Sequence, residues 1–233
     1  METSAEVDRL RAVYQQYAAR GFGVSKWSGA NKGNQALQRE RASKTRELLQ
    51  RSGFFPLTHR RILEVGCGGG QQLGLFLNWG AKPENLIGID LIPERIRAAQ
   101  ITFPGIAFQV ANAESLPFHE GSFDLVAAFT VFTSILNPRM TANICAEINR
   151  VLAPGGGILW YDFRVNNPFN KNVHGLSRGQ IHRLLPGFDL SLEAISLLPP
   201  LARCLGALTD RLYRPLCFLP FLRTHLLGLL RKR

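Results

Sequence analysis

The chain has 233 residues, 45% of them hydrophobic, and a formal net charge of +11. This length and apolar content suffice for a packed core, so intrinsic disorder is not expected. The first eight residues lack a basic segment followed by an apolar run, which argues against a secretory signal or transit peptide and makes the cytoplasm the expected compartment.

The positive charge is concentrated toward the two ends of the chain. Residues 1–60 contain 11 Lys and Arg against 5 Asp and Glu, residues 61–170 contain 7 against 9, and residues 171–233 contain 10 against 3. Nucleic acid, a membrane surface or an anionic substrate would suit this asymmetry, and so would an enzyme with a basic exterior.

The four cysteines are far apart in the sequence, at positions 67, 145, 204 and 217. They form no Cys-x-x-Cys pair, and no histidine lies at a metal-binding spacing from them. We therefore expect free thiols, no disulfide and no bound metal.

Two helices are expected before residue 60. Apolar residues recur at three- and four-residue steps between residues 5 and 20, and a second helix is expected over residues 35–50. The loop between them is polar and rich in glycine, and it carries Trp27. This aromatic ring and that of Tyr17 either anchor the helices to the core or border a binding site.

A glycine-rich turn follows a short apolar strand within Arg61–Gln72. Residues 62–65 predict a buried parallel strand, and Gly66, Gly68 and Gly70 then permit positive φ and close approach of a ligand to the backbone. A dinucleotide fingerprint has its glycines at the first, third and sixth positions. Here they occupy the first, third and fifth, which differs from that fingerprint.

The second strand is expected over residues 85–91 and carries Asp90 near its end. A carboxylate at this place can accept hydrogen bonds from both hydroxyls of a ribose. A third strand is expected over residues 107–110, and a fourth over residues 122–129, which read Ser-Phe-Asp-Leu-Val-Ala-Ala-Phe. A helix near residues 140–152 and a Pro-Gly-Gly-Gly turn then lead into a fifth strand that is expected to end at Trp160.

These elements, in this order and spacing, resemble the class I S-adenosylmethionine-dependent methyltransferases of the general small-molecule and ubiquinone-biosynthesis type. The resemblance covers about residues 60–162. It implies an α/β fold with a doubly wound, Rossmann-like, seven-stranded sheet, an antiparallel C-terminal edge and S-adenosyl-L-methionine as cofactor. It also implies an N-terminal helical cap over residues 1–60 and a methyltransferase core over residues 61–233.

The resemblance assigns cofactor contacts to the glycine turn and to the ends of the strands. The implied cofactor-binding residues are Glu64, Gly66, Cys67, Gly68, Gly70, Asp90, Leu91, Asn112, Ala113 and Phe129. Asn112 departs from the family pattern, in which an aspartate faces the adenine amino group, although an amide oxygen can still accept that hydrogen bond.

Substrate contacts are expected from the N-terminal segment and from residues 161–170. By resemblance, Tyr17 and Trp27 are candidate lid residues. Arg164 could bind a carboxylate or phosphate and Asn166 a sugar or amide, unless this segment is only a local Asn- and Pro-rich turn.

Methyl transfer is an in-line displacement on an activated sulfonium, so positioning can provide most of the catalysis. An oxygen acceptor can still need a base, and the candidates near the expected site are Asp162, Tyr161 and His174.

The last third of the chain predicts a short helix at residues 180–185 and strands at residues 188–197 and 224–230. Between these strands, residues 199–221 form a hydrophobic, basic insert that is too interrupted to span a bilayer. The insert could cap an apolar pocket, contact a peripheral membrane surface or form a dimer seam, and the oligomeric state is not predicted.

The expected function is methyl transfer to a small-molecule acceptor, glycan- or lipid-linked, with oxygen favoured as the methylated atom. Specific nucleic-acid binding is not expected, because residues 129–132 read Phe-Thr-Val-Phe where amino-directed nucleic-acid methyltransferases have an Asn-Pro-Pro-Tyr-like motif. The alternatives are carbon methylation of a quinone-type precursor, a non-catalytic cofactor-binding protein of the same fold, and an NAD-dependent oxidoreductase.

Overall fold

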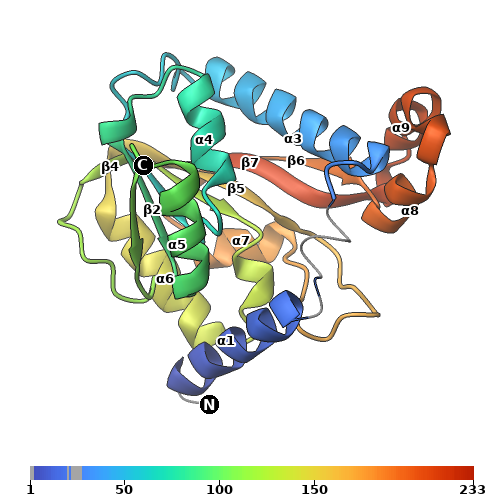
Figure 1. Ribbon diagram of the computed structural model, residues 1–233. Helices are drawn as coiled ribbons and strands as arrows, with labels where there is room; N and C mark the ends of the chain where they lie inside the picture. Colours follow the sequence, from blue (N-terminus) through green and yellow to red (C-terminus); the bar gives the residue numbers. More distant parts are fainter. Residues whose placement is uncertain (1–2, 20, 22–27) are drawn as a thin grey trace.

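The computed structural model describes residues 3–19, 21 and 28–233. This part of the chain is built on a seven-stranded sheet with the order β3-β2-β1-β4-β5-β7-β6 (Figure 1). The strands are β1 (Ile62–Val65), β2 (Leu86–Asp90), β3 (Ala107–Val110), β4 (Phe123–Phe129), β5 (Leu152–Phe163), β6 (Phe188–Leu197) and β7 (Arg223–Lys232). The first five strands are parallel, and β7 pairs antiparallel with both β5 and β6. The predicted doubly wound sheet with an antiparallel C-terminal edge is confirmed.

Helices cover both faces of this sheet (Figure 1). The α-helices are α1 (Thr3–Ala19), α3 (Lys32–Arg51), α4 (Gln71–Asn78), α5 (Pro93–Thr102), α6 (Pro138–Val151), α7 (Arg178–Leu184), α8 (Pro199–Cys204) and α9 (Thr209–Cys217). Short 3-10 helices are η1 (Pro83–Asn85), η2 (Phe132–Ser134), η3 (Gly206–Leu208) and η4 (Pro220–Leu222). N-cap side chains define where two of these helices begin. Asn137 accepts hydrogen bonds from two backbone N–H groups at the start of α6, and Ser177 forms a capping box with Gln180 at the start of α7.

Alternate residues of the central strands supply two separate hydrophobic layers. Ile62 and Leu63 are neighbours in β1 and both are fully buried, but successive side chains of a strand point to opposite faces of the sheet. The cluster that contains Ile62 includes residues of α3, α4 and α5, whereas the cluster that contains Leu63 includes residues of α6 and α7. Burial on both faces favours apolar side chains at successive positions, which accounts for Ile62, Leu63 and Val65 in β1; Glu64 is the buried polar exception.

The fifth strand is longer than its sequence predicts. It continues to Phe163 because β7 pairs with it as far as His225, opposite Phe163. This extension carries Tyr161, Asp162 and Phe163 as part of a regular strand rather than a loop. Their side chains therefore alternate between the two faces of the sheet.

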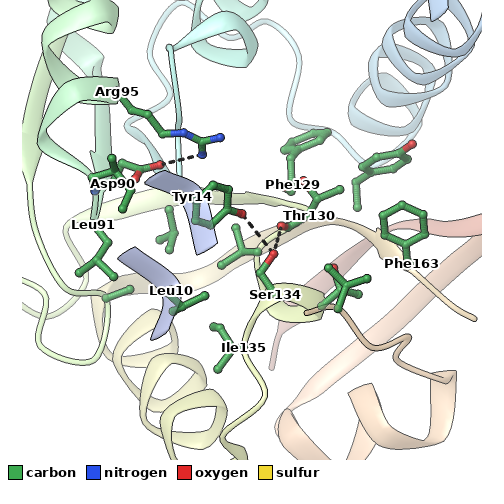
Figure 2. A pocket seen from close by; sticks show the side chains of 18 of the residues that line it. Leu10, Tyr14, Asp90, Leu91, Arg95, Phe129, Thr130, Ser134, Ile135 and Phe163 are labelled. Carbon is green, nitrogen blue, oxygen red and sulfur yellow. Dashed lines mark hydrogen bonds and ion pairs between the residues drawn. The ribbon is translucent and has the colours of Figure 1, made fainter. Parts of the chain in front are cut away.

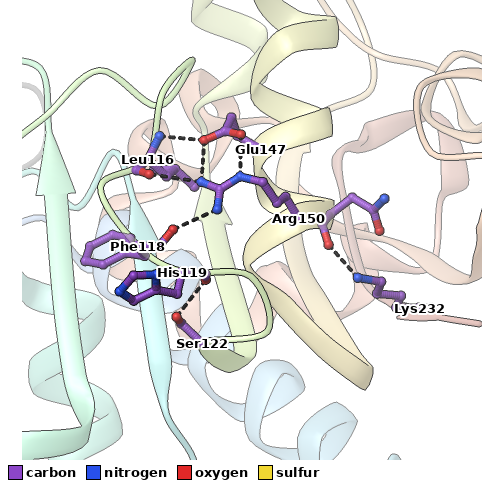
Figure 3. A network of polar contacts seen from close by, with 8 residues as sticks. Leu116, Phe118, His119, Ser122, Glu147, Arg150 and Lys232 are labelled. Carbon is purple, nitrogen blue, oxygen red and sulfur yellow. Dashed lines mark hydrogen bonds and ion pairs between the residues drawn. The ribbon is translucent and has the colours of Figure 1, made fainter.

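A polar network fixes the long loop between β3 and β4 onto α6 (Figure 3). The Arg150 guanidinium donates to the backbone oxygens of Phe118 and Leu116 at 2.7 and 3.0 Å and forms an ion pair with Glu147 at 2.7 Å. Glu147 in turn accepts from the backbone N–H of Leu116 at 2.7 Å. The loop is thus held at its middle by hydrogen bonds to main-chain atoms, and its first residues border the cavity described below.

Candidate active site

A cavity of about 760 Å³ lies at the carboxyl ends of the parallel strands, between the sheet and residues of α1 and α3 (Figure 2). This edge of an open parallel sheet is where ligands bind in doubly wound folds. The strand ends and the loops that follow them contribute Val65, Gly66, Asp90, Leu91, Asn112, Ala113, Phe129, Thr130, Tyr161 and Phe163. The two N-terminal helices contribute Leu10, Tyr14, Tyr17, Asn34, Leu37, Gln38 and Arg41.

The glycine turn has the backbone geometry that its sequence predicts. Gly66, Gly68 and Gly70 have φ angles of +66°, +55° and +81°, a region that side chains disfavour. A Cβ at Gly66 would lie 2.8 Å from a methyl group of Val131, and one at Gly70 would lie 2.7 Å from the ring of Phe108. Glycine is therefore required here both by backbone conformation and by the close packing around the turn.

The Asp90 carboxylate lies at the cavity wall in a fixed orientation. It is only 5% exposed yet lines the cavity, and its two carboxylate oxygens accept from the backbone N–H groups of Gly68 and Ile92, each at 2.9 Å. These bonds fix the plane of the carboxylate and leave further lone pairs for a ligand, because each ionised oxygen can accept more than one hydrogen bond. The Arg95 guanidinium lies 3.8 Å from the same carboxylate.

The predicted cofactor residues divide into two groups. Six line the cavity: Gly66, Asp90, Leu91, Asn112, Ala113 and Phe129. The other four do not line the cavity and belong to the end of β1 and to the glycine turn: Glu64, Cys67, Gly68 and Gly70. Burial raises the pKa of Glu64 well above its ordinary value, against the opposing charge of Arg41, and one of its carboxyl oxygens has no hydrogen-bond partner among the described residues.

The side chain of Asn112 is engaged in a local turn. Its oxygen accepts from the backbone N–H of Glu114 at 3.1 Å, and its nitrogen donates to the Glu114 carboxylate at 3.3 Å. The amide oxygen retains one lone pair, so it can still accept from a ligand amine at the cavity wall.

Of the three predicted bases, Tyr161 lines the cavity. Its hydroxyl pairs with the Ser196 hydroxyl at 2.9 Å, and burial raises its pKa to about 12. Asp162 is fully buried behind the cavity wall, where it accepts hydrogen bonds from the Thr133 hydroxyl and from the backbone N–H groups of Thr133 and Phe163. Burial raises the pKa of Asp162 to about 6. His174 is half-buried and does not line the cavity, and its backbone N–H donates to the Thr133 carbonyl at 2.9 Å.

Of the four residues predicted to contact the substrate, one lines the cavity, two do not, and one lies outside the described residues. Tyr17 lines the cavity and its hydroxyl is 3.4 Å from the side-chain oxygen of Asn170, another cavity residue. Neither Arg164 nor Asn166 lines it, and the Asn166 oxygen accepts from the backbone N–H of Gly175, which closes a local turn. Trp27 lies outside the described residues.

Two cavity residues, Arg41 and His225, are absent from the candidates predicted by sequence. The Arg41 guanidinium lies 5.6 and 5.4 Å from the ring centres of Phe129 and Tyr161, and its buried Nε has no hydrogen-bond partner in the described part of the chain. His225 stacks on Tyr161 with ring centres 4.6 Å apart and planes at 4°. Burial lowers the pKa of His225 to about 3, so its imidazole is neutral at pH 7.

Helix α1 is fastened over the cavity by polar contacts (Figure 2). The Tyr14 hydroxyl lies 3.2 Å from the Ser134 hydroxyl, and the Arg95 guanidinium lies 4.3 Å from the centre of the Tyr14 ring. At the start of the helix, the Glu6 carboxylate accepts from the backbone N–H of Leu136 and pairs with Arg9 at 2.8 Å. These contacts connect the N-terminal helix with the loop after β4 and, through Arg95, with the Asp90 carboxylate.

The cavity brings together several of the residues from which the sequence predicts a cofactor-binding site. It combines an acid at the end of β2, a glycine turn at the end of β1 and apolar side chains on either side of them. No group of three or more His, Cys, Asp or Glu side chains among residues 3–19, 21 and 28–233 is arranged to hold a metal ion.

Comparison with known proteins agrees with this geometry. Residues 62–156 match the family model described as a methyltransferase domain. The phthiotriol/phenolphthiotriol dimycocerosates methyltransferase of Mycobacterium leprae is 37% identical over 113 residues, which are 48% of this chain and 40% of that protein. The chain therefore matches less than half the length of this curated relative.

Solved structures share the architecture at lower sequence identity. An S-adenosylmethionine-dependent methyltransferase from Mesorhizobium loti has a TM-score of 0.59 and 19% identity, over 88% of this chain and 100% of that one. The cyclase SpnF has a TM-score of 0.59 and 20% identity, over 82% of this chain and 80% of that one. The strand order, the glycine-turn geometry and the match of residues 62–156 to a methyltransferase domain together support a class I methyltransferase fold with S-adenosyl-L-methionine as its cofactor.

Proposed function

We propose that this protein transfers a methyl group from S-adenosyl-L-methionine to a small, amphipathic acceptor. The observation that supports this is the composition of one continuous cavity. Asp90 and the glycine turn occupy one end, and an aromatic compartment formed by Phe129, Tyr161, Phe163 and His225 occupies the other. A donor at the first end would direct its reactive group toward an acceptor in the second.

Five residues would hold the cofactor. Asp90 would accept from the two ribose hydroxyls, Leu91 and Ala113 would pack against the adenine, and Asn112 would accept from its amino group. Arg41 would pair with the carboxylate of the methionine part, because its guanidinium lies over Phe129 at the end of β4 and its Nε has no acceptor among the residues that the structure describes. Bound S-adenosyl-L-methionine supplies a methyl group already activated by a sulfonium.

Positioning is the main catalytic contribution that we propose for the chain itself. The Tyr161 hydroxyl is engaged by Ser196, and Asp162 lies behind the wall, where its hydrogen bonds hold η2 through Thr133. His225 is a neutral imidazole in the acceptor compartment and is the candidate to receive a proton from an acceptor hydroxyl as the new bond forms. Its low pKa makes it a weak base, so we expect its contribution to be smaller than that of alignment.

The proposed acceptor has an apolar portion, and oxygen methylation is favoured over carbon methylation. The apolar and aromatic side chains of the second compartment would contact the apolar portion. The mycobacterial relative is named for phthiotriol and phenolphthiotriol dimycocerosates, which are lipid-like small molecules. That name supports a lipid-linked acceptor here.

Transfer of labelled methyl groups tests this function directly. The full chain is incubated with methyl-labelled S-adenosyl-L-methionine and a cell extract, which is then separated into organic-soluble, aqueous small-molecule, nucleic-acid and protein fractions. Label in the organic-soluble fraction supports the proposal, and nuclear magnetic resonance of the product shows whether the new methyl is on oxygen or carbon. Label confined to nucleic acid or protein would overturn the proposed acceptor class.

The same assay separates catalysis from binding. Bound cofactor with no transfer to any fraction would identify a cofactor-binding protein of the same fold, and the similarity to the cyclase SpnF makes this comparison necessary. Binding of NAD in preference to S-adenosyl-L-methionine, measured by calorimetry, would favour an oxidoreductase. His225→Phe keeps an aromatic ring beside Tyr161, and we expect about a tenfold or smaller loss of turnover if positioning dominates.

A further inference from the structure

We propose that the helical segment of residues 199–222 docks onto a lipid bilayer containing anionic headgroups. This segment comprises α8, η3, α9 and η4, and it forms the end of the molecule beyond β6 and the N-terminal end of α3 (Figure 1). The docking itself does not require the methyl-transfer reaction. Its role, to place the cavity near a membrane-held acceptor, rests on the proposed function.

The inner face of the segment is firmly packed, so its outer face is presented in a defined orientation. Ala202 and Tyr213 are buried against α3, and the Tyr213 hydroxyl donates to Glu40 at 2.6 Å. Gly33 of α3 approaches the α8 backbone so closely that a Cβ there would lie 2.0 Å from the Ala202 carbonyl oxygen. A loosely attached segment would not show such complementary packing.

The outer face is apolar to an unusual degree. Phe218 is 78% exposed and Phe221 is 74% exposed, and Leu208, Leu212 and Leu219 are also exposed. Isolated exposed apolar residues are common on protein surfaces, but large apolar side chains gathered within fifteen residues indicate an interaction surface. Aromatic rings at such a surface suit the interfacial region of a bilayer.

The charge of the same segment selects the partner. Arg211 and Arg214 are exposed on α9 and make no ion pair with any residue in the described part of the chain. Asp210, the acidic residue of the segment, already lies 3.9 and 3.8 Å from Lys32 and Arg39 of α3. A second copy of the chain would bring arginines against arginines, whereas anionic headgroups would be attracted to them.

The segment also borders the cavity. Pro199, the first residue of α8, lines the cavity together with Leu37, Gln38 and Arg41 of α3. None of the helices in the described ranges is both long and apolar enough to cross a bilayer, and the arrangement proposed here is interfacial. Docking through this end would keep the cavity next to the headgroup region.

Vesicle binding by the full chain tests the proposal without cofactor or acceptor. Sedimentation is compared for vesicles of phosphatidylcholine alone and of phosphatidylcholine mixed with phosphatidylglycerol, at low and physiological salt. We expect binding to the mixed vesicles, weakened by salt. Removing both charges with Arg211→Gln and Arg214→Gln should lower binding about thirtyfold, since each arginine near an anionic surface contributes a factor of about five.

Matched variants distinguish vesicle binding through this segment from non-specific binding through other exposed apolar or basic residues. Phe218→Ser with Phe221→Ser should reduce vesicle binding at least about tenfold, whereas Phe169→Ser, which alters a phenylalanine that is 96% exposed elsewhere, should not. Arg178→Gln with Arg183→Gln removes the same charge from the region of α7 and should have a much smaller effect. Circular dichroism of each variant checks that it is folded.

Two results would overturn the proposal. One is equal wild-type binding, or none, to the two kinds of vesicle. The other is a wild-type protein that does not bind vesicles but dimerises with increasing concentration in analytical ultracentrifugation. If the two phenylalanine substitutions abolish that dimerisation, the surface is a subunit interface. Because no methyl donor is present, either failure is distinguishable from failure of the proposed reaction.

Discussion

Replacing Asp90 by alanine should weaken S-adenosyl-L-methionine binding by about 30- to 150-fold. The carboxylate is buried, held in orientation by two backbone N–H groups, and open to the cavity, so a ligand would find it preorganised. Loss of a charge-assisted acceptor for two ribose hydroxyls costs about 2–3 kcal/mol. The substitution also leaves the N–H groups of Gly68 and Ile92 without their acceptor, so some destabilisation of the fold is expected.

Calorimetric titration with S-adenosyl-L-methionine measures the effect on binding, and thermal unfolding without ligand measures the effect on stability. Asp124→Ala is the matched control. Like Asp90, Asp124 is a carboxylate at a strand end that accepts a backbone hydrogen bond, here from the N–H of Arg61, and it also accepts from the Arg61 guanidinium, but it does not line the cavity. We expect it to lower stability with little change in affinity. Unchanged affinity in Asp90→Ala, with only a loss of stability, would refute the assignment of the ribose to this carboxylate.

Three further predictions concern the surroundings of the cavity. Arg41→Met should preserve the packing over Phe129 and Tyr161 but weaken cofactor binding by about 1.5–3 kcal/mol, measured by the same titration. If Arg41 binds the methionine carboxylate, the wild type and Arg41→Met should bind a ligand that lacks this carboxylate with equal affinity. The pKa of Asp162 is about 6 in the folded state and about 3.9 in the unfolded state, so between these values the folded state binds a proton more tightly than the unfolded state does. The free energy of unfolding should therefore fall by up to about 3 kcal/mol, through this carboxyl group, as the pH rises from 4 through 6. Urea unfolding across that range should therefore show a steeper decline for the wild type than for Asp162→Asn, and identical pH profiles would contradict the predicted shift. Arg150→Ala should remove the main-chain anchors of the loop between β3 and β4, lower stability by about 1–3 kcal/mol in urea unfolding, and increase amide exchange in residues 114–119; protection unchanged in that loop would show that the network is dispensable.

The sequence determined the central architecture because its signals are local. β1 is a short apolar run followed directly by the glycine turn, and β2 is one that ends in Asp90, so both could be identified without knowing what lies beside them. The Pro-Gly-Gly-Gly segment likewise marks the first part of β5. The right-handed connection of such units then leaves few ways to order the strands. That is why the fold could be predicted, and why six of the ten residues predicted to bind the cofactor line the cavity at the carboxyl edge of the sheet.

Tertiary structure decided the acceptor side of the cavity. His225 reaches Tyr161 only because β7 pairs antiparallel with β5, and Arg41 reaches Phe129 only because α3 packs across the strand ends. Neither residue lies in a local motif. Asp162 was predicted beside Tyr161 as a candidate base, but consecutive strand residues face opposite sides, and the extension of β5 by pairing with β7 directs Asp162 behind the wall to Thr133. Contacts made across the sheet, far apart in sequence, therefore determine which polar groups can meet an acceptor.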